Sequence, residues 1–391
     1  MNLFDEIIDR KNVASSKWNP DYLNSLFFSE EVLPFWIADM DFKSPAPMLE
    51  NIKQRADYGI LAYEYSPASF YSSLIRWVEK HHHYPLAKEH IQASPSIGTS
   101  IAVAINCLSE EGDGVIIQPP VFMEYMNFIK NNNRRIVKNK LKEENGKYSI
   151  DFEDLELKAR DPRTKLLILC NPHNPIGQIW NFKELTRMMQ ICKENNVFVL
   201  SDEVHADIVY PPNHFDGCLA LDPKFHSHII SLYSPVKTFN LGGFSDSFIF
   251  IKDPELKEQI SSYMKKYLLG KTNGIIRSAL EEAFNSSEQW LKELIIYLNG
   301  NIDLIEKMIN ENNLPIKFHR PEASYQLWLD FRESGMNAKE VHEFLCKKAK
   351  LGMNAGFWFG SEGIGFTRMN IASPRSVVKE GMERLVAAFK K

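Results

Sequence analysis

The sequence lacks the features typical of disulfide-linked, secreted or membrane-spanning proteins. Cysteine is sparse, odd in number and without a Cys-x-x-Cys pair, which predicts free thiols in a reducing compartment; the residues are Cys107, Cys170, Cys192, Cys218 and Cys346. No apolar run approaches the roughly 20 residues needed to cross a bilayer. The first residues are acidic instead of basic and then apolar, so we expect no secretory signal.

An excess of charge of one sign is also missing. The net charge is −4 and the isoelectric point is about 6.3, which gives no electrostatic basis for binding nucleic acid or an anionic membrane. We find no internal repeat and no low-complexity tract. These absences predict a soluble, cytoplasmic protein with neither nucleic acid nor membrane as a partner.

Short apolar runs alternate with amphipathic stretches between about residues 91 and 265. The ranges 114–117, 165–169 and 197–200 are typical of buried strands, and 182–196 has the periodicity of a helix. This alternation predicts an α/β fold with a mostly parallel sheet covered on both faces. A chain of 391 residues is long for one core, which favours two domains.

The pattern changes near residue 288, where long helices follow and only short strand candidates such as 326–329 remain. We therefore predict a large domain over residues 46–287 and a smaller α+β C-terminal domain over 288–391. Residues 1–45 are expected to form an N-terminal arm that joins the small domain. A long helix is expected between about 286 and 310.

Three polar residues each follow a predicted strand. Asn174 comes after the run 166–170, Asp202 after 197–201 and Lys237 after 229–232. The carboxyl ends of parallel strands meet at one edge of a sheet, where ligands bind. An amine that forms a Schiff base, a carboxylate that keeps a pyridine nitrogen protonated and an amide beside the ring oxygen are what pyridoxal 5′-phosphate (PLP) requires. Each residue alone is ordinary, but the set predicts a PLP pocket in which Lys237 is catalytic.

The cofactor phosphate needs backbone donors at a helix start. The stretch 96–100, Ser-Ile-Gly-Thr-Ser, precedes an apolar helical run and offers such a start, although alone it would be an ordinary helix cap. Ser234 is a further candidate donor. Arg368 lies among apolar and aromatic neighbours, which favours a clamp for a substrate carboxylate over a surface salt bridge.

Other signals carry less weight. The consecutive histidines at 81–83 point in different directions on a helix, so we predict no metal site. The stretch 360–365 has no preceding strand and no complete dinucleotide fingerprint, which disfavours a nicotinamide site.

Several motifs resemble a known family. The stretches 171–177 (Asn-Pro-His-Asn-Pro-Ile-Gly), 201–205 (Ser-Asp-Glu-Val-His) and 234–240 (Ser-Pro-Val-Lys-Thr-Phe-Asn) look like those of fold-type I, class I/II aminotransferase-like enzymes. The stretch 35–42 (Phe-Trp-Ile-Ala-Asp-Met-Asp-Phe) is similar to the branch of cystathionine β-lyases and C–S lyases that includes MalY and PatB. The resemblance covers nearly the whole chain and implies a three-layer, aspartate aminotransferase-like large domain.

The resemblance also implies residue roles. Lys237 would bond to the cofactor, Asp202 would pair with its ring nitrogen and Asn174 would bind its ring oxygen. Substrate would be held by Arg368 through its α-carboxylate and lined by the stretch that contains Trp36, Ala38 and Asp39. The remaining cofactor contacts implied are Gly98 and Thr99 at the phosphate, Phe122 stacked on the ring in place of the usual tyrosine, His205, and Tyr63 reaching the phosphate of a neighbouring subunit.

A homodimer with shared sites and an amino-acid substrate follow from these roles. The resemblance favours α,β-elimination from cystathionine or a related S-substituted amino acid, which yields a thiol, pyruvate and ammonia. An aminotransferase is the alternative enzyme, because the same motifs serve its first steps. An alternative of another class is a regulatory protein that binds a partner on this fold.

Overall fold

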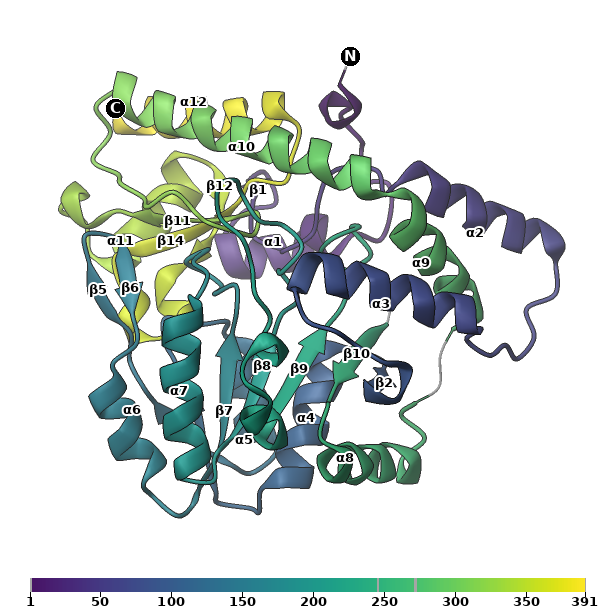
Figure 1. Ribbon diagram of the computed structural model, residues 1–391. Helices are drawn as coiled ribbons and strands as arrows, with labels where there is room; N and C mark the ends of the chain where they lie inside the picture. The colour runs from purple at the N-terminus through teal and green to yellow at the C-terminus, as the bar shows by residue number, and fades with distance from the viewer. Residues whose placement is uncertain (1, 245, 271–272, 391) are drawn as a thin grey trace.

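The computed structural model describes residues 2–244, 246–270 and 273–390, and its centre is a seven-stranded sheet (Figure 1). The strand order is β2-β10-β9-β8-β7-β3-β4, and β10 is antiparallel to both of its neighbours while β9, β8, β7, β3 and β4 pair in parallel. The bounds are β2 Ile91–Ser94, β3 Gly114–Ile117, β4 Arg135–Lys138, β7 Thr164–Cys170, β8 Phe198–Asp202, β9 Ile229–Tyr233 and β10 Ser247–Phe250.

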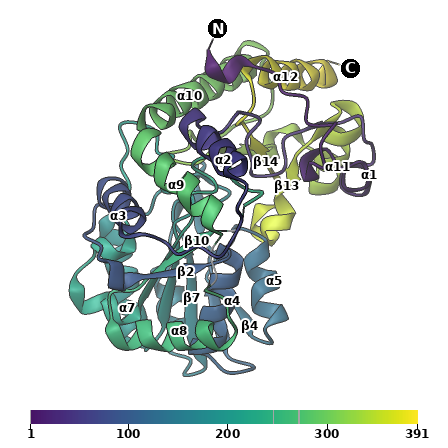
Figure 2. The same cartoon turned by 90° about the vertical axis from the view of Figure 1, so that its right-hand side faces the viewer.

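Strand β7 shows why this sheet is buried on both faces. Successive side chains of a strand point to opposite faces, so alternate residues enter different cores. Leu167 and Leu169 join the larger apolar cluster, whereas Leu166 and Ile168 join a second cluster on the other face. The second cluster lies between the sheet and helices α4, α5 and α8. The larger one lies between the opposite face of the sheet and helices that include α3, α7 and α9 (Figure 2). The predicted three-layer α/β fold is therefore confirmed.

Helices surround the sheet and continue into the C-terminal part. Capping residues fix where several begin: Asn181 accepts hydrogen bonds from two amides at the start of α7, and Ser96 accepts one at the start of α4. The helices are α1 Pro20–Phe27, α2 Ala46–Tyr58, α3 Ala68–His82, α4 Ile97–Leu108, α5 Glu124–Asn131, α6 Phe152–Ala159, α7 Phe182–Glu194, α8 Pro254–Lys266, α9 Gly274–Ser286, α10 Glu288–Glu311, α11 Ala338–Glu343 and α12 Arg375–Phe389.

A smaller sheet lies beyond α10, in the order β11-β14-β13, with α10 and α12 packed together beside it. Its strands are β11 Gln326–Asp330, β13 Asn354–Ala355 and β14 Phe366–Asn370, and the remaining short strands are β1 Leu33–Pro34, β5 Lys142–Glu144, β6 Lys147–Ser149 and β12 Leu351–Gly352. Strand β1 of the N-terminal segment pairs in parallel with β12. This pairing supports an arm joined to the C-terminal part, although the division at residues 45 and 287 stays a prediction.

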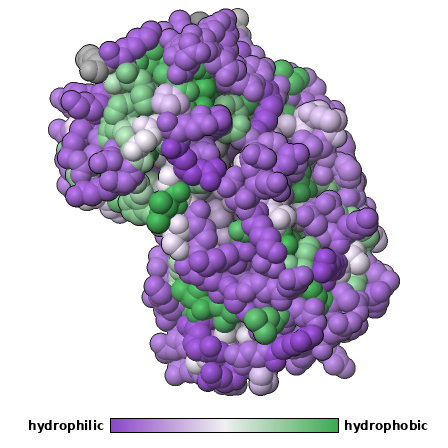
Figure 3. Space-filling model, turned by 90° about the vertical axis from the view of Figure 1, so that its left-hand side faces the viewer, coloured by the Kyte–Doolittle hydropathy of each residue, from purple (hydrophilic) through white to green (hydrophobic). Residues whose placement is uncertain are grey.

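The predicted elements are present close to their expected bounds, including β3, β7, β8, β11, α7 and the long helix α10. In the described ranges, no helix is long and apolar enough to cross a membrane. The face shown in Figure 3 is mainly hydrophilic, with small hydrophobic areas, and its outline narrows between an upper and a lower part.

Candidate active site

A cavity of about 690 Å³ opens at the carboxyl edge of the parallel strands. Strand β8 ends at Asp202, β7 ends four residues before Asn174, and β9 ends four residues before Lys237. All three side chains line the cavity, so the sheet brings the predicted set together. Most of the other predicted residues line it too: Ala38, Gly98, Thr99, Phe122, His205 and Ser234.

Lys237 lies in the turn 235–240 that follows β9. Its Nζ donates a hydrogen bond to the Ala38 carbonyl oxygen over 2.6 Å. Burial lowers the pKa of Lys237 to about 8; the Asp39 and Asp202 carboxylates act in the opposite direction, and Arg368 adds to the lowering. An amine whose pKa lies this close to neutrality can lose its proton and act as a nucleophile or a base.

The turn that carries Lys237 is tied to the N-terminal segment by Asn240. The Asn240 amide nitrogen donates to the carbonyl oxygens of Met40 (3.0 Å) and Phe42 (2.8 Å), and its Oδ1 accepts from the Met40 amide over 3.0 Å. These contacts hold residues 40–42 against the turn. They explain how Ala38, nearly 200 residues away in sequence, reaches the lysine.

Asp202 is buried and accepts two hydrogen bonds. The Tyr125 hydroxyl donates to Oδ2 over 2.6 Å, and the Val204 amide donates to Oδ1 over 3.2 Å. Burial raises the pKa of Asp202 to about 6, against the lowering effect of the Tyr125 hydrogen bond. A buried carboxylate of this kind gains most from a cationic partner, and a protonated ring nitrogen is such a partner.

Arg368, on β14, lies behind Asn174 and does not itself line the cavity. Its Nη1 donates to the Asn174 Oδ1 over 3.1 Å, and its Nη2 donates to the Trp36 carbonyl oxygen and to the Asn354 Oδ1, each over 2.8 Å. Its buried Nε has no hydrogen-bond partner in the part of the chain that the structure describes. Burial lowers the pKa of Arg368 to about 10, so it remains a cation at neutral pH.

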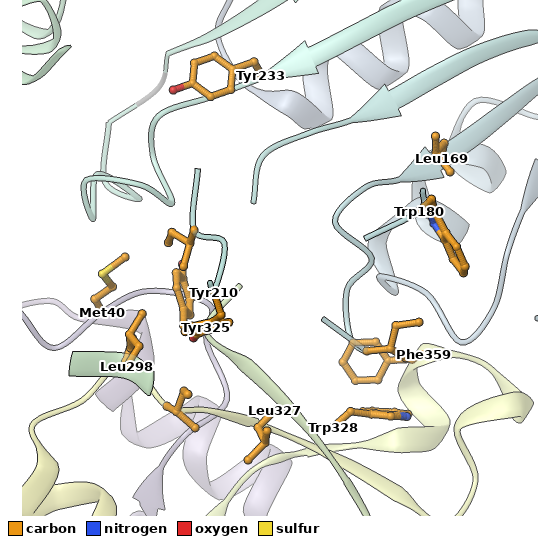
Figure 4. Packing of buried hydrophobic residues seen from close by; sticks show 14 of the residues in the cluster. Met40, Leu169, Trp180, Tyr210, Tyr233, Leu298, Tyr325, Leu327, Trp328 and Phe359 are labelled. Atoms are coloured by element: carbon orange, nitrogen blue, oxygen red, sulfur yellow. The ribbon is translucent and has the colours of Figure 1, made fainter. Parts of the chain in front are cut away.

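His205 lines the cavity, and Tyr325 packs edge-on against the His205 ring with centroids 5.7 Å apart. The Tyr325 hydroxyl donates to the Ala38 carbonyl oxygen over 3.0 Å, beside the Lys237 amine that shares this acceptor. The His205 Nδ1 lies 3.0 Å from the Ser324 hydroxyl, and burial lowers the pKa of His205 to about 3. The imidazole is therefore neutral. Figure 4 shows Tyr325 among the buried residues of the larger apolar cluster.

The segment that carries Asn174 is held by a close backbone approach. Gly177 has a φ of +71°, and a Cβ there would lie 2.6 Å from the Pro321 Cβ. Its carbonyl oxygen accepts from the amides of Glu322 (2.8 Å) and Ala323 (2.9 Å). Glycine is required at this position because a side chain would push the two segments apart.

The first turn of α4 forms the opposite end of the cavity. Ser96 caps the helix by accepting from the Thr99 amide over 3.0 Å, and the Gly98 Cα lies so close to Phe128 that a Cβ would be 2.9 Å from its ring. The Ser234 hydroxyl donates to the Asp246 carbonyl oxygen over 2.7 Å. A helix start beside a hydroxyl-bearing segment is the arrangement that binds phosphate. The amides of this first turn that Ser96 does not cap fit that group, and the Ser234 hydroxyl would turn from Asp246 to donate to it.

Three predicted residues lie elsewhere. The Trp36 indole packs against Phe27 and donates to the Lys17 carbonyl oxygen over 3.1 Å, so only its backbone faces Arg368. The Asp39 carboxylate pairs with Arg10 over 2.6 Å and lines a separate cavity of about 290 Å³. Tyr63 is fully exposed and does not reach the cavity within its own chain.

Sequence reasoning missed Tyr125 and Tyr325 as site residues. Tyr125 lies three positions after Phe122, and its ring packs edge-on against Phe122 with centroids 5.5 Å apart. A buried tyrosine one helical turn after a stacking aromatic is a weak signal, since a tyrosine at that spacing commonly belongs to the core. Nothing near Tyr325 in sequence indicates its contact with Ala38.

Comparison with known proteins agrees with this geometry. The model of the family "aminotransferase class I and II" matches residues 33–385. The chain belongs to this family. Cystathionine β-lyase PatB of Bacillus subtilis (strain 168) is 34% identical over 386 residues, covering 99% of each chain.

Two solved structures are also similar over nearly their whole length. A PLP-bound structure from Clostridium difficile 630, provisionally named an aminotransferase, has a TM-score of 0.95 at 35% identity and covers 99% of this chain and 100% of its own. Cystalysin of Treponema denticola, which contains pyridoxal 5′-phosphate, has a TM-score of 0.94 at 32% identity and covers 100% and 99%. The resemblance to the cystathionine β-lyase branch is confirmed.

Proposed function

We propose that the chain is a PLP-dependent C–S β-lyase that converts cystathionine or a related S-substituted amino acid, with water, into a thiol, pyruvate and ammonia. The observation that carries this proposal is the convergence of Lys237, Asp202 and Asn174 on one cavity, with Arg368 directly behind Asn174. Full-length similarity to PatB supports the lyase reaction.

Each residue has a role that follows from its surroundings. When bound, PLP supplies an electron sink that makes the substrate α-proton removable. The Lys237 Nζ then takes that proton, since its lowered pKa leaves a fraction of the amine neutral. The Asp202 carboxylate would keep the pyridine nitrogen of bound PLP protonated, and the Asn174 amide would hold the ring oxygen. The first turn of α4 and Ser234 would hold the phosphate.

Arg368 is proposed to bind the substrate α-carboxylate. Its guanidinium is already oriented by Asn174, Asn354 and the Trp36 carbonyl, which leaves its buried Nε to a further acceptor. A preoriented guanidinium binds a planar carboxylate with little loss of side-chain freedom. These contacts come from the segment after β7, from β13 and from the N-terminal segment, so the guanidinium is fixed by three parts of the chain before substrate binds.

We further propose a homodimer in which each site borrows Tyr63 from the other chain. The loop between α2 and α3 projects from the body of the molecule (Figure 1), and its apolar side chains are more than half exposed; they include Tyr58, Ile60, Leu61, Tyr63 and Tyr65. An exposed apolar group of this size favours contact with another protein surface. A second copy is the partner that the proposed role of Tyr63 requires.

Complementation tests the shared sites. Lys237→Ala and Tyr63→Ala subunits, each inactive alone, are mixed under conditions in which subunits exchange. One site of each heterodimer then receives both intact groups, so activity should return. No recovery after exchange has been demonstrated by mass spectrometry would contradict shared sites.

A product assay separates the lyase from the aminotransferase, which remains the runner-up because the Clostridium difficile relative carries that provisional name. The purified protein is incubated with cystathionine, and separately with an amino acid and a 2-oxo acid. We expect pyruvate from cystathionine and little exchanged amino acid, and neither product from Lys237→Ala. Exchange faster than pyruvate release would favour the aminotransferase. Full activity of Lys237→Ala would overturn both readings.

A further inference from the structure

A second buried polar cluster lies next to the active site and is not used by the proposed reaction. We call it the His82 cluster; its members are Trp77, His82, Glu203, Asp207, Tyr233 and Thr238. All are at most 4% exposed. Glu203 and Asp207 belong to the same segment as Asp202 and His205, but they do not line the cavity.

Asp207 is the centre of this cluster. Its Oδ1 lies 3.0 Å from the His82 Nε2, and its Oδ2 accepts from Trp77 Nε1 (3.1 Å), the Tyr233 hydroxyl (2.8 Å) and the Thr238 hydroxyl (2.6 Å). These donors come from α3, the end of β9 and the turn that carries Lys237. One carboxylate therefore joins a helix, a strand and the catalytic turn.

Glu203 completes the partners of His82. Its Oε2 lies 3.3 Å from the His82 Nδ1, and its Oε1 accepts from the Ser201 hydroxyl (2.9 Å) and the Cys218 amide (3.0 Å). Each imidazole nitrogen thus faces a carboxylate oxygen, so both nitrogens carry protons and His82 is a cation. Burial opposes this charge, but the hydrogen bonds to Asp207 and Glu203 raise the pKa of His82 to about 9.

We propose that Asp207 is a positioning residue that fixes Lys237 through the Thr238 hydroxyl. The inference rests on the catalytic role proposed for Lys237. Thr238 is the next residue in the chain, so the 2.6 Å hydrogen bond anchors the lysine backbone on the side away from the cavity. Asn240 anchors the same turn on the side of the N-terminal segment. The lysine amine is thereby held where it meets the Ala38 carbonyl oxygen.

The His82 cation explains why Asp207 can serve as a rigid anchor. A buried carboxylate without a counter-charge would gain by taking up a proton, and its hydrogen bonds would rearrange. Burial alone raises the pKa of Asp207, but the hydrogen bond and the charge of His82 bring it well below its usual range. Since small displacements of a reacting group can cost roughly a hundredfold in rate, a rigid anchor behind Lys237 matters for turnover.

Threonine variants test this inference in the cofactor-loaded enzyme. Thr238→Val removes the hydroxyl and keeps the shape, and Thr238→Ser restores a hydroxyl. Thr164→Val is the matched control, because Thr164 is also buried and its hydroxyl has no partner among the described residues. Three quantities are measured: kcat and KM with cystathionine, and the pH midpoint of the visible absorbance of the lysine-bound cofactor.

We expect Thr238→Val to lower kcat about tenfold or more with KM changed less than about twofold. The absorbance midpoint should move by roughly half a pH unit or more, because the lysine nitrogen shifts relative to Arg368 and Asp202. Thr238→Ser should recover most of both effects, and Thr164→Val should match the wild type. Asp207→Asn should change both quantities in the same direction as Thr238→Val.

Two outcomes would overturn the inference. One is a kcat and a midpoint for Thr238→Val that match those of Thr164→Val; the other is no rescue by Thr238→Ser. Failure of the proposed function gives a different result: a wild-type protein that releases no pyruvate would refute the lyase, while the absorbance midpoints would still test the anchor.

Discussion

Residues 202–207 contribute to two buried polar clusters that differ in how completely their charges are partnered. On the cavity side, Lys237 donates to a single neutral acceptor, and Asp202 accepts from two neutral donors. In the His82 cluster, the histidine lies between two carboxylates, and Asp207 receives four contacts. Asp202 and Asp207 are equally buried, each 4% exposed, so these two carboxylates differ in their partners and not in depth, whereas Lys237 is half-buried at the cavity wall.

The pKa values of the buried groups differ according to whether a counter-charge is in direct contact. Burial without a counter-charge in direct contact lowers the pKa of Lys237 to about 8, so the amine can exchange a proton near neutral pH. It raises the pKa of Asp202 to about 6, so this carboxylate gains most from a cationic partner. Burial with a directly bonded counter-charge raises the pKa of His82 to about 9 and lowers that of Asp207, so both stay charged. Adjacent residues of one segment thus serve reactivity on one side and rigidity on the other.

The largest loss of activity is expected from a substitution of Asp202 in the cavity. Asp202→Asn keeps the shape but cannot stabilise a protonated pyridine nitrogen, so we expect kcat to fall at least about a hundredfold and cofactor binding to weaken. Pyruvate release and an absorbance titration with PLP measure the two effects. Asp113→Asn, at a buried carboxylate that accepts from the Glu110 amide, is the control. Unchanged values for Asp202→Asn would remove Asp202 from the mechanism.

The pH dependence of the free energy of unfolding tests whether His82, in the His82 cluster, is a cation. A folded-state pKa of about 9 lies above the ordinary 6.5, so His82 stabilises the fold fully below pH 6.5 and loses this effect as pH rises through 9. The difference corresponds to about 3 kcal/mol of unfolding free energy. Asp207 keeps its stabilising effect across this window, because its lowered pKa titrates only in acid.

Urea unfolding between pH 6.5 and 9.5 provides the measurement. Over this range the wild type should lose stability relative to His82→Gln, which should start less stable. Lys237, whose lowered pKa adds stability as pH rises above about 8, is common to both proteins, so the difference between their slopes isolates His82. Tyr84 and Tyr233, whose pKa values burial raises well above the ordinary value, stay neutral throughout. His83→Gln, at the exposed neighbouring position, is the control. Equal slopes for wild type and His82→Gln would show that His82 is not a buried cation.

The residues of the two clusters also differ in whether the sequence predicts them. Asp202 and Lys237 are predictable because each follows an apolar run, and the carboxyl ends of parallel strands converge. Asp207 has no such signal: it lies five residues beyond β8, and its partners come from α3 and from two segments near residue 235. Contacts between distant segments depend on how the helices pack, which local periodicity does not encode.

The same limit explains the placements of Trp36 and Asp39. The motif at 35–42 predicted a stretch beside the substrate, and its Ala38 does line the cavity. In an extended segment, neighbouring side chains point in different directions. The Trp36 indole therefore enters an apolar cluster with Phe27, and Asp39 pairs with Arg10. A motif indicates which segment approaches a site but not which of its side chains face it.

A smaller effect is expected at Arg368, whose buried Nε has no hydrogen-bond partner among the described residues. A charge-assisted contact with a substrate carboxylate contributes about 1.5–3 kcal/mol, so Arg368→Ala should raise KM roughly tenfold or more. Arg368→Lys should recover only part of the loss, because an ammonium lacks the planar fork. Cofactor affinity, measured by absorbance, should stay near the wild-type value. Loss of cofactor at unchanged KM would assign Arg368 to the cofactor instead.

The smallest effect is expected at Tyr125, whose hydroxyl donates one of the two hydrogen bonds that Asp202 accepts. Tyr125→Phe removes the 2.6 Å hydrogen bond, so the pKa of Asp202 should rise further and a larger fraction of the carboxyl should be protonated at neutral pH. One hydrogen bond contributes about 1 kcal/mol net, which corresponds to roughly fivefold weaker PLP binding.

Tyr210→Phe is the matched control for this substitution, because Tyr210 is equally buried and its hydroxyl has no partner in the described part of the chain. Its PLP affinity should equal that of the wild type. The affinity loss of Tyr125→Phe should shrink as pH rises from 6 to 8, since Asp202 regains its charge above its raised pKa. A loss that does not change with pH would mean that the hydroxyl shapes the cavity without tuning the carboxylate.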